Sequence, residues 1–431
     1  MTIALMLAGM LALALLNVPI AVALGLVAVA AIVLTQGTYM LPNVALVMFD
    51  GASSFPLLAI PLFILAGAIM NASSISRRLI AFASALFGFV RGGLSMVVIG
   101  ASMFFAEISG SAVAGVAALG TILIPAMRSR GYSREFAAAI SSSAASLAII
   151  IPPSIPMILY GVMAQTSVVK MFVAGILPGV VGAVGLAIAA YIQAVRYGFP
   201  VEERFQLARV WQTFKEALWA FMLPVIILGG IFGGFVTATE GAGLAVAAAL
   251  FVSIVIYHEL DLRALRRACI DGGVQTAVVM LLVASSALIG TFLTEAQLPQ
   301  ALAQRITEFT SDKYVVLLLL NVFFLVLGMF LHSAAAIILV VPIVMPMVTA
   351  AGIDPVHFGL VVTLNLAIGQ QTPPVASVLI AACAIARSDI WQTTKVNLPF
   401  IAALLVVLLL CTYVPAISLV LVDLFYGSGP R

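Results

Sequence analysis

Two pairs of adjacent prolines, each in the middle of a long apolar stretch, constrain this chain most. Pro152-Pro153 lies within the segment 141–161, which begins with three serines, and Pro373-Pro374 lies within the segment 364–379. A proline lacks a backbone N–H and blocks a helix through the preceding turn, so each pair must interrupt a helix. In lipid, freed backbone groups are tolerated only where protein, water or a ligand satisfies them. Broken helices in corresponding positions of two halves indicate the binding site of a secondary transporter.

The composition places these stretches in a polytopic membrane protein. Of the 431 residues, 64% are hydrophobic and 8% are charged, whereas soluble domains carry about 25% charged residues. Windows of about 20 apolar residues, long enough to cross a bilayer, recur along the chain. No Walker A, HExxH, GxSxG or CxxC pattern occurs. ATP hydrolysis, proteolysis and thiol redox chemistry therefore lack support, and we expect no enzyme activity.

The apolar segments divide into two matching halves, each with two spans, an amphipathic arm, an over-long apolar hairpin, a broken helix and a span. We expect a first repeat over 1–197, a connector with a central span at 217–236 over 198–238, and a second repeat over 239–425. The expected parts are hairpins 94–127 and 314–348, broken helices 135–165 and 357–386, arms 77–93 and 295–313, and closing span 398–424. An odd number of crossings before the second copy predicts that it is inverted.

Positive charges orient the chain. With the flanks of the first hairpin in the cytoplasm, all 19 lysines and arginines fall inside except Lys170, Arg305, Lys313 and Arg431. Such an excess on one side is typical of cytoplasmic loops. We therefore expect a cytoplasmic N-terminus, a C-terminus on the opposite side, and a second hairpin that opens opposite to the first.

The centre of the first hairpin combines small and polar residues. Ser109-Gly110-Ser111 offers hydroxyls and a glycine that lets backbone approach an ion, while tight helix packing is the alternative reading. Glu107 precedes this tip, and a carboxylate at membrane depth indicates function by default. It is a candidate coupling residue that binds a cation or carries a proton, unless it only neutralises a helix end.

Corresponding residues mark the second half. His332 and Ser333 lie at the centre of the second hairpin, and Gln370-Gln371-Thr372 precedes the second proline pair. Exposed backbone carbonyls at such tips and breaks suit a dehydrated Na⁺, and helix N-termini suit an anion. Glu240 follows a turn near the interface, and we expect a structural role for it.

These residues resemble the large membrane subunit (M subunit, DctM-like) of tripartite ATP-independent periplasmic (TRAP) transporters, within the ion transporter superfamily. The matching stretches span nearly the whole chain in order: Ile60–Gly67, Ile108–Ala112, Ile151–Ile155, Thr239-Glu240, Gly328–Leu331, and Gly369 with Thr372–Val375. The resemblance implies an all-α, inverted-repeat, elevator-type transporter in the bacterial inner membrane. It further implies Na⁺-coupled uptake of a small carboxylate delivered by a periplasmic substrate-binding protein, beside a small four-span membrane subunit.

The resemblance also assigns residues. Those implied for Na⁺ are Ser109, Gly110, Pro152, Gly328, Ser333, Gly369, Gln371 and Thr372, and those implied for the substrate are Ser109, Ser111, Ser154, His332 and Thr372. The chain departs from the family pattern at three places: His332 replaces the usual aspartate, two glutamines precede Thr372, and Ala376 replaces the usual glycine. The change at His332 leaves the number of coupled cations open.

Two alternatives remain at this point. The chain would be a stand-alone organic anion symporter of the same superfamily if it were coupled to Na⁺, or to H⁺ through Glu107 or His332, without a binding protein. A channel would need a continuous polar-lined pathway, whereas the polar residues gather at two tips and two breaks.

Overall fold

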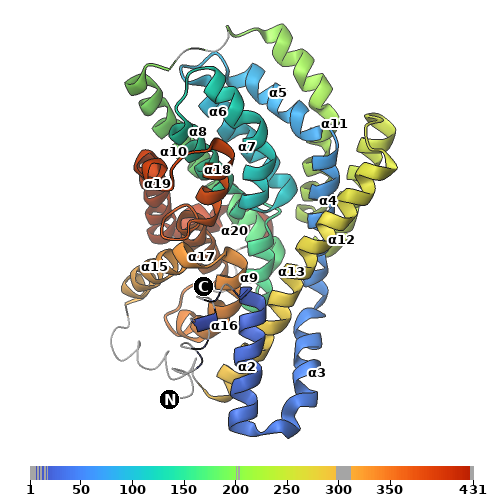
Figure 1. Cartoon of the computed structure of the whole chain (residues 1–431), viewed down its shortest axis with the longest axis vertical. Helices are drawn as coiled ribbons and strands as arrows, with labels where there is room; N and C mark the ends of the chain where they lie inside the picture. The colour runs from blue at the N-terminus through green and yellow to red at the C-terminus, as the bar shows by residue number, and fades with distance from the viewer. Residues whose placement is uncertain are drawn as a thin grey trace.

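The structure, a computed structural model, describes residues 18–199, 201, 204–297 and 312–427, together with Met6, Gly9, Ala12, Leu13 and Leu16. In this part the regular structure is helical, and no β-strand occurs (Figure 1). The first-half helices are α2 (Ile20–Gln36), α3 (Leu41–Ala52), α4 (Ala59–Ala72), α5 (Ile75–Phe87), α6 (Gly93–Ser109), α7 (Ala112–Ser129), α8 (Arg134–Ser146), α9 (Ile155–Met163) and α10 (Val168–Tyr197). The later helices are α11 (Leu207–Phe232), α12 (Ala238–Phe251), α13 (Leu262–Glu295), α15 (Lys313–Phe330), α16 (Ser333–Ala350), α17 (Pro355–Gly369), α18 (Ser377–Ala386), α19 (Ile390–Tyr413) and α20 (Pro415–Tyr426).

Nine helical segments of the described part are long and apolar enough to cross a bilayer. They include α7, α15 and α16, which are arms of the two hairpins. Both hairpins lie where the small, polar centres predict them: α6 turns into α7 at Gly110, and α15 turns into α16 at Leu331-His332.

Both broken helices are also present. Helix α8 ends in a short 3₁₀ turn at Leu147–Ile149, and α9 begins after the first proline pair. Helix α17 ends at Gly369, and α18 begins at Ser377 after the second pair. Each interruption of a helix contains one of the proline pairs. The prolines lack the backbone N–H that a continuing helix would need.

Helix packing follows the two-fold pattern of an inverted repeat. Helix α7 of the first hairpin packs on α8 and on α18, and the corresponding α16 packs on α17 and on α9. In the same way α2 packs on α13, and α12 packs on α4. Each hairpin thus contacts one half of its own broken helix and the opposite half of the other, so the two repeats interlock.

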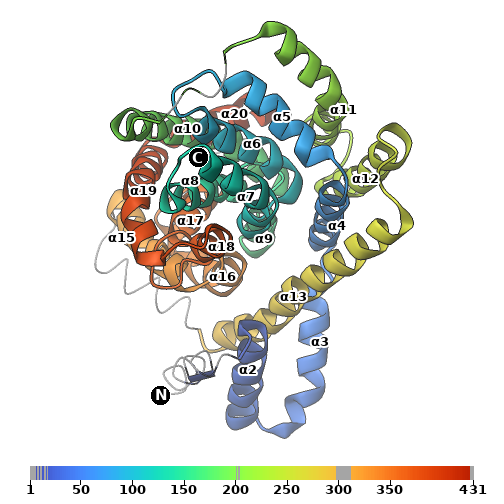
Figure 2. The same cartoon turned by 45° about the horizontal axis from the view of Figure 1, so that its top comes forward.

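The helices form two groups, seen from two sides in Figures 1 and 2. The inner bundle comprises α6–α10 and α15–α20. The frame comprises α2–α5 and α11–α13, with the long α13 running diagonally beside the bundle and α2 and α3 alongside its far end. Helix α13 contacts α16, and α4 contacts α6 and α9, so these two frame helices face the hairpins and breaks.

Several predicted boundaries differ from the structure. Helix α11 begins at Leu207, ten residues before the predicted central span at 217, so much of the polar connector is helical. The closing span is two helices, α19 and α20, because Pro415 cannot supply the N–H that would continue α19. Most of the predicted arm 295–313, and most of the first span before residue 18, lie outside the described residues.

Candidate functional site

A cavity of about 430 Å³ lies between the inner bundle and the frame. Its bundle side is formed by the beginnings of α7, α9 and α16 and by Gln370 at the second break. Its frame side is formed by Ile64 of α4 and by one face of α13: Val274, Gln275, Val278 and Val279. Both hairpin tips therefore open into one space, which is lined on the opposite side by mostly aliphatic frame residues.

Gly110 fixes how the first tip meets the first break. Its φ of 57° is left-handed, and a Cβ placed on it would lie 2.9 Å from the carbonyl oxygen of Pro153 and 3.2 Å from the amide nitrogen of Ile155. A side chain at this position would collide with backbone, so glycine alone allows this approach. The tip and the break predicted from the sequence are thus in direct contact.

Two serines begin the helices at this contact. Ser111 is the N-cap of α7, and its Oγ accepts a hydrogen bond from the amide of Ala114 at 3.5 Å. Ser154 is the N-cap of α9, where its Oγ accepts from the amide of Met157 and donates to the carbonyl of Ile149 at 2.6 Å. Ser111 lines the cavity, whereas Ser154 is fully buried behind it.

The second tip brings His332 and Ser333 to the same cavity. His332 is the N-cap of α16, but its side chain makes no capping hydrogen bond. Ser333 is only 1% exposed. Its place in the lining means that its small exposed surface lies at the cavity, where its hydroxyl can donate to or accept from a ligand.

The other residues implied for the second cation lie behind this tip. Gly328 and Gly369 face each other across α15 and α17 at backbone distance. The hydroxyl of Thr372 donates to the carbonyl of Ile368 at 2.9 Å. These residues lie around the second break without lining the cavity.

The two glutamines at the second break point in different directions. Gln370 is 1% exposed and lines the cavity, with its Oε1 accepting from the hydroxyl of Ser377 at 3.4 Å. Gln371 is fully buried and turned away, toward Ser143 of α8 and Asn397 of α19. The hydroxyl of Ser143 can donate to either of two side-chain oxygens, Oε1 of Gln371 or Oδ1 of Asn397. The second oxygen lies 2.8 Å away. We call Ser143, Gln371 and Asn397 the amide cluster.

The structure thus gathers four predicted residues, Gly110, Ser111, His332 and Ser333, on one cavity. Pro152 and Ser154 lie at the adjoining break. Ser109 and Glu107 fall in the last turn of α6, and their side chains lie outside what the structure describes. Glu240 forms a capping box with Thr237 at the start of α12, which confirms its structural role.

Sequence reasoning missed Gln275 and Asn397 as contributors. Each is a single polar residue in an apolar helix, which is a weak signal by itself. Ser143 is one of the three serines that precede the first proline pair in segment 141–161, yet its hydroxyl bonds to Gln371 at the second break.

No formal charge comes from the described residues of the cavity lining. Likewise no group of three or more His, Cys, Asp or Glu side chains that would hold a metal ion is found in the described part. A cation there would rely on hydroxyl, amide and backbone carbonyl oxygens, which are ligands that suit a hard cation such as Na⁺.

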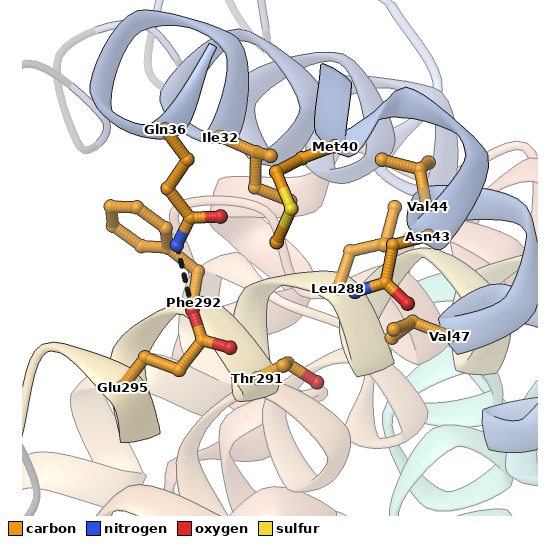
Figure 3. A pocket seen from close by; sticks show the side chains of 10 residues that line it. All are labelled: Ile32, Gln36, Met40, Asn43, Val44, Val47, Leu288, Thr291, Phe292 and Glu295. Atoms are coloured by element: carbon orange, nitrogen blue, oxygen red, sulfur yellow. Dashed lines mark hydrogen bonds between the residues drawn. The ribbon is translucent and has the colours of Figure 1, made fainter. Parts of the chain in front are cut away.

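A second, much smaller pocket lies within the frame (Figure 3). It is surrounded by α2, α3 and α13, and Gln36 Nε2 donates a hydrogen bond to a carboxylate oxygen of Glu295 at 2.7 Å across it. Its volume of about 20 Å³ holds roughly one water molecule. It is too small for an organic substrate.

Comparison with known proteins gives a consistent result. Residues 7–417 match the profile of the family described as "Tripartite ATP-independent periplasmic transporter, DctM component". The chain is 38% identical to the C4-dicarboxylate TRAP transporter large permease protein DctM of Pseudomonas aeruginosa, over 88% of this chain and 89% of that protein. It is 36% identical to the sialic acid TRAP transporter large permease protein SiaM of Vibrio cholerae, over 98% of each.

A third relative is longer. The isethionate TRAP transporter permease protein DctMQ of Oleidesulfovibrio alaskensis is 42% identical over 94% of this chain, which spans 64% of that protein's length. Among solved structures, the YdaH transporter of Alcanivorax borkumensis shares the fold with a TM-score of 0.63 at 17% identity, over 92% of this chain and 91% of that one.

Proposed function

Because the chain belongs to the DctM family, the large permease component of TRAP transporters, we propose that it carries a small organic acid into the cell together with Na⁺. The observation that supports this most is the cavity between the two hairpin tips. It is the one place in the described structure where both tips and both breaks contribute to a single space. Convergence of this kind near a repeat interface is the usual place for a transporter's substrate.

The chemistry of the lining supports an anionic cargo. Helices α7 and α16 begin at the cavity, and the first amides of a helix together with its dipole favour negative charge. Hydroxyls of Ser111 and Ser333 and the imidazole of His332 provide further hydrogen bonds. In this proposal Ser111 and His332 contact the acid, as the family resemblance implies, and Ser109, Ser154 and Thr372 lie at or behind the contact.

The cations are placed at the two tip-and-break contacts. Around Gly110 and Pro152, the oxygens that bind the cation come from the backbone and from the side chain of Ser109. Around Gly328 and Gly369 they come from the backbone, with Ser333 and Thr372 as side-chain ligands. Gln371, implied by the resemblance, is not a side-chain ligand in this proposal, because its side-chain oxygen accepts from Ser143 and Asn397 instead. Each site joins a hairpin to a broken helix, so an ion bound there would hold tip and break together, which couples its binding to that of the acid.

The position of the cavity supports an elevator movement. The polar residues belong mainly to the inner bundle, while the frame supplies mostly aliphatic side chains. A smooth apolar wall resists movement less than a wall of paired polar groups, because no buried hydrogen bonds must break. We propose that the inner bundle slides along α4 and α13 to expose the cavity to each side in turn.

Two partners belong to the proposal. The named relatives are permease components of TRAP transporters, and the isethionate relative's name joins M and Q in one chain. We propose that a small membrane subunit binds this chain and that a periplasmic binding protein delivers the acid, with the chain in the bacterial inner membrane, its N-terminus in the cytoplasm and its C-terminus in the periplasm.

The test uses the complex in liposomes. The acid is first identified by the thermal stabilisation of the binding protein, and its labelled form is then supplied outside vesicles with an inward Na⁺ gradient. We expect uptake that stops when K⁺ replaces Na⁺ or when the binding protein is omitted. Equal uptake in K⁺ would overturn Na⁺ coupling, and full uptake without the binding protein would identify a stand-alone symporter.

A further inference from the structure

A buried hydrogen bond joins the first broken helix to the second break, through Ser143 of α8 and Gln371. We propose that the amide cluster couples the two cation sites, so that an ion at the first break raises the affinity for an ion at the second. This inference rests on the proposed function and names the residues through which its two cation sites communicate.

The first step concerns the first break. Ser143 lies in the last turn of α8, which continues directly into the 3₁₀ turn Leu147–Ile149. The last carbonyl of that turn accepts a hydrogen bond from the hydroxyl of Ser154 at 2.6 Å. The backbone around Ser154 is also the surface that Gly110 of the hairpin tip approaches. An ion that holds this tip on the break therefore also fixes the end of α8 that carries Ser143.

The second step concerns the second break. Gln371 follows the end of α17 at Gly369 and lies between Gln370, which lines the cavity, and Thr372. The backbone N–H of Gln371 and the hydroxyl of Thr372 both donate to the carbonyl of Ile368. A displacement of Gln371 therefore moves the backbone that carries the proposed ligands of the second cation.

The third step concerns the link between the breaks. Ser143, Gln371 and Asn397 are fully buried, and both Ser143 and Asn397 can donate to Oε1 of Gln371. The amide nitrogen of Gln371 has no partner among the described residues, so Oε1 makes all the hydrogen bonds of this side chain. No other side-chain hydrogen bond within the described part of the chain joins α8 to the second break. The position of Gln371 thus depends on the position of Ser143.

The fourth step gives the sign of the coupling. Separation of Ser143 from Gln371 would leave buried polar groups unpaired, which is unfavourable. The two breaks therefore move together, and an ion that orders one of them leaves less ordering for the ion at the other. Coupling between sites typically changes affinity by about 5- to 150-fold. Direct repulsion between two cations acts in the opposite direction, so the sign of the measured coupling separates the two effects.

The test measures equilibrium binding of radioactive Na⁺ to the purified full-length chain without any acid, with choline keeping the ionic strength constant. We expect the wild type to bind two ions with a Hill coefficient of about 1.5, which corresponds to roughly ten-fold coupling between two equal sites. Ser143→Ala should still bind two ions, with a coefficient close to 1. Asn397→Leu removes the other partner of Oε1 and should lower the coefficient in the same way.

Ser146→Ala is the matched control. Ser146 is another fully buried serine of α8, but its hydroxyl donates to the carbonyl of Ser142 within the same helix at 3.0 Å. This variant loses a buried hydroxyl without losing the link between the breaks, so it should keep the wild-type Hill coefficient. A purely structural role of Ser143 would lower the thermal stability of Ser143→Ala and leave its Hill coefficient at the wild-type value.

The inference is overturned if the wild type binds its ions with a Hill coefficient of 1 or less, or if Ser143→Ala keeps the wild-type coefficient. Its failure differs from that of the proposed function. Na⁺-driven uptake by the full complex together with non-cooperative Na⁺ binding would remove the coupling and leave transport intact. Absence of both Na⁺ binding and Na⁺-driven uptake would remove both.

Discussion

Gly369 of α17 and Gly328 of α15 touch backbone to backbone: a Cβ placed on Gly369 would lie 2.6 Å from both the Cα and the carbonyl carbon of Gly328. No real side chain fits at that distance. The second hairpin and the second broken helix are therefore in contact through two residues that have no side chains, directly behind the tip that carries His332 and Ser333.

We expect Gly369→Ala to destabilise the protein by about 1–3 kcal/mol, because the added methyl forces α15 and α17 apart. Thermal unfolding in detergent measures the change. Gly290→Ala on α13 is the matched control, because nothing lies within 4 Å of its Cβ position. A Gly369→Ala protein as stable as the wild type would show that the two helices separate freely.

Ala376 precedes α18 in the left-handed conformation, with φ 47° and ψ 55°. This conformation is strained for alanine and not for glycine. Ala376→Gly should therefore stabilise the protein by about 0.5–1 kcal/mol. Ala382→Gly, in the middle of the same helix, should instead destabilise it by about 1 kcal/mol. Chemical or thermal unfolding of the two variants tests both predicted changes in stability. A loss of stability in Ala376→Gly would show that alanine is not strained at this position.

Glu259, in the loop before α13, links that loop to the start of α5 within the frame. It accepts from the amide of Ser74 at 3.0 Å and pairs with Arg78 at 3.1 Å. Burial raises the pKa of Glu259, but the hydrogen bonds from Ser74 and the charge of Arg78 together outweigh it and lower the pKa below its ordinary value. A lowered folded pKa gives stability that is present above the unfolded pKa and lost as pH falls through the folded one.

Glu259→Gln should therefore cost about 0.5 kcal/mol at pH near 7, a modest value because the pair is partly exposed. The difference from wild type should shrink as pH falls below the ordinary pKa of a glutamate, about 4.3, and vanish once pH lies below the lowered pKa of the folded carboxyl. Melting temperatures of both proteins across that range measure it. A difference that is independent of pH would show that charge plays no part.

The amide cluster links α8, the second break and α19. Asn397→Leu removes a partner from both Ser143 and Gln371, which are fully buried, and should cost about 1–3 kcal/mol. Because Ser143 and Asn397 share one hydrogen bond, the losses of stability caused by Ser143→Ala and Asn397→Leu should not be additive. A double-mutant cycle by thermal unfolding should give a coupling of about 1 kcal/mol. Strict additivity would mean that the residues act separately.

His332 is the one ionisable side chain of the described cavity lining. In the proposed transport cycle His332→Ala removes a hydrogen bond to a charged cargo and should lower Na⁺-driven uptake by about ten-fold. His258→Asn, in the loop before α13, is the control and should retain wild-type uptake. Unchanged uptake by His332→Ala in reconstituted vesicles would remove this residue from the site.

The proline pairs and the small, polar hairpin centres predicted the fold well, because they act locally. Pro152-Pro153 and Pro373-Pro374 must break a helix whatever surrounds them, and Gly110 permits a turn that other residues do not. The direction of Gln371 could not be predicted, since it depends on Ser143 and Asn397, which lie 228 and 26 positions away in the chain. Gln275 was missed for a related reason: which face of α13 meets the cavity is set by packing against the hairpins, not by the local sequence.

Each hairpin packs against the broken helix of the other repeat as well as its own, and this has a consequence for biosynthesis. Helices α7 and α8 must wait for α18 and α19 before their inner faces are covered, and those helices emerge from the ribosome more than 200 residues later. Until translation is nearly complete, the nascent first half has to hold polar serines in the membrane without their final neighbours. Truncation before α18 should therefore leave an assembly intermediate that depends on cellular quality control, rather than a smaller working permease.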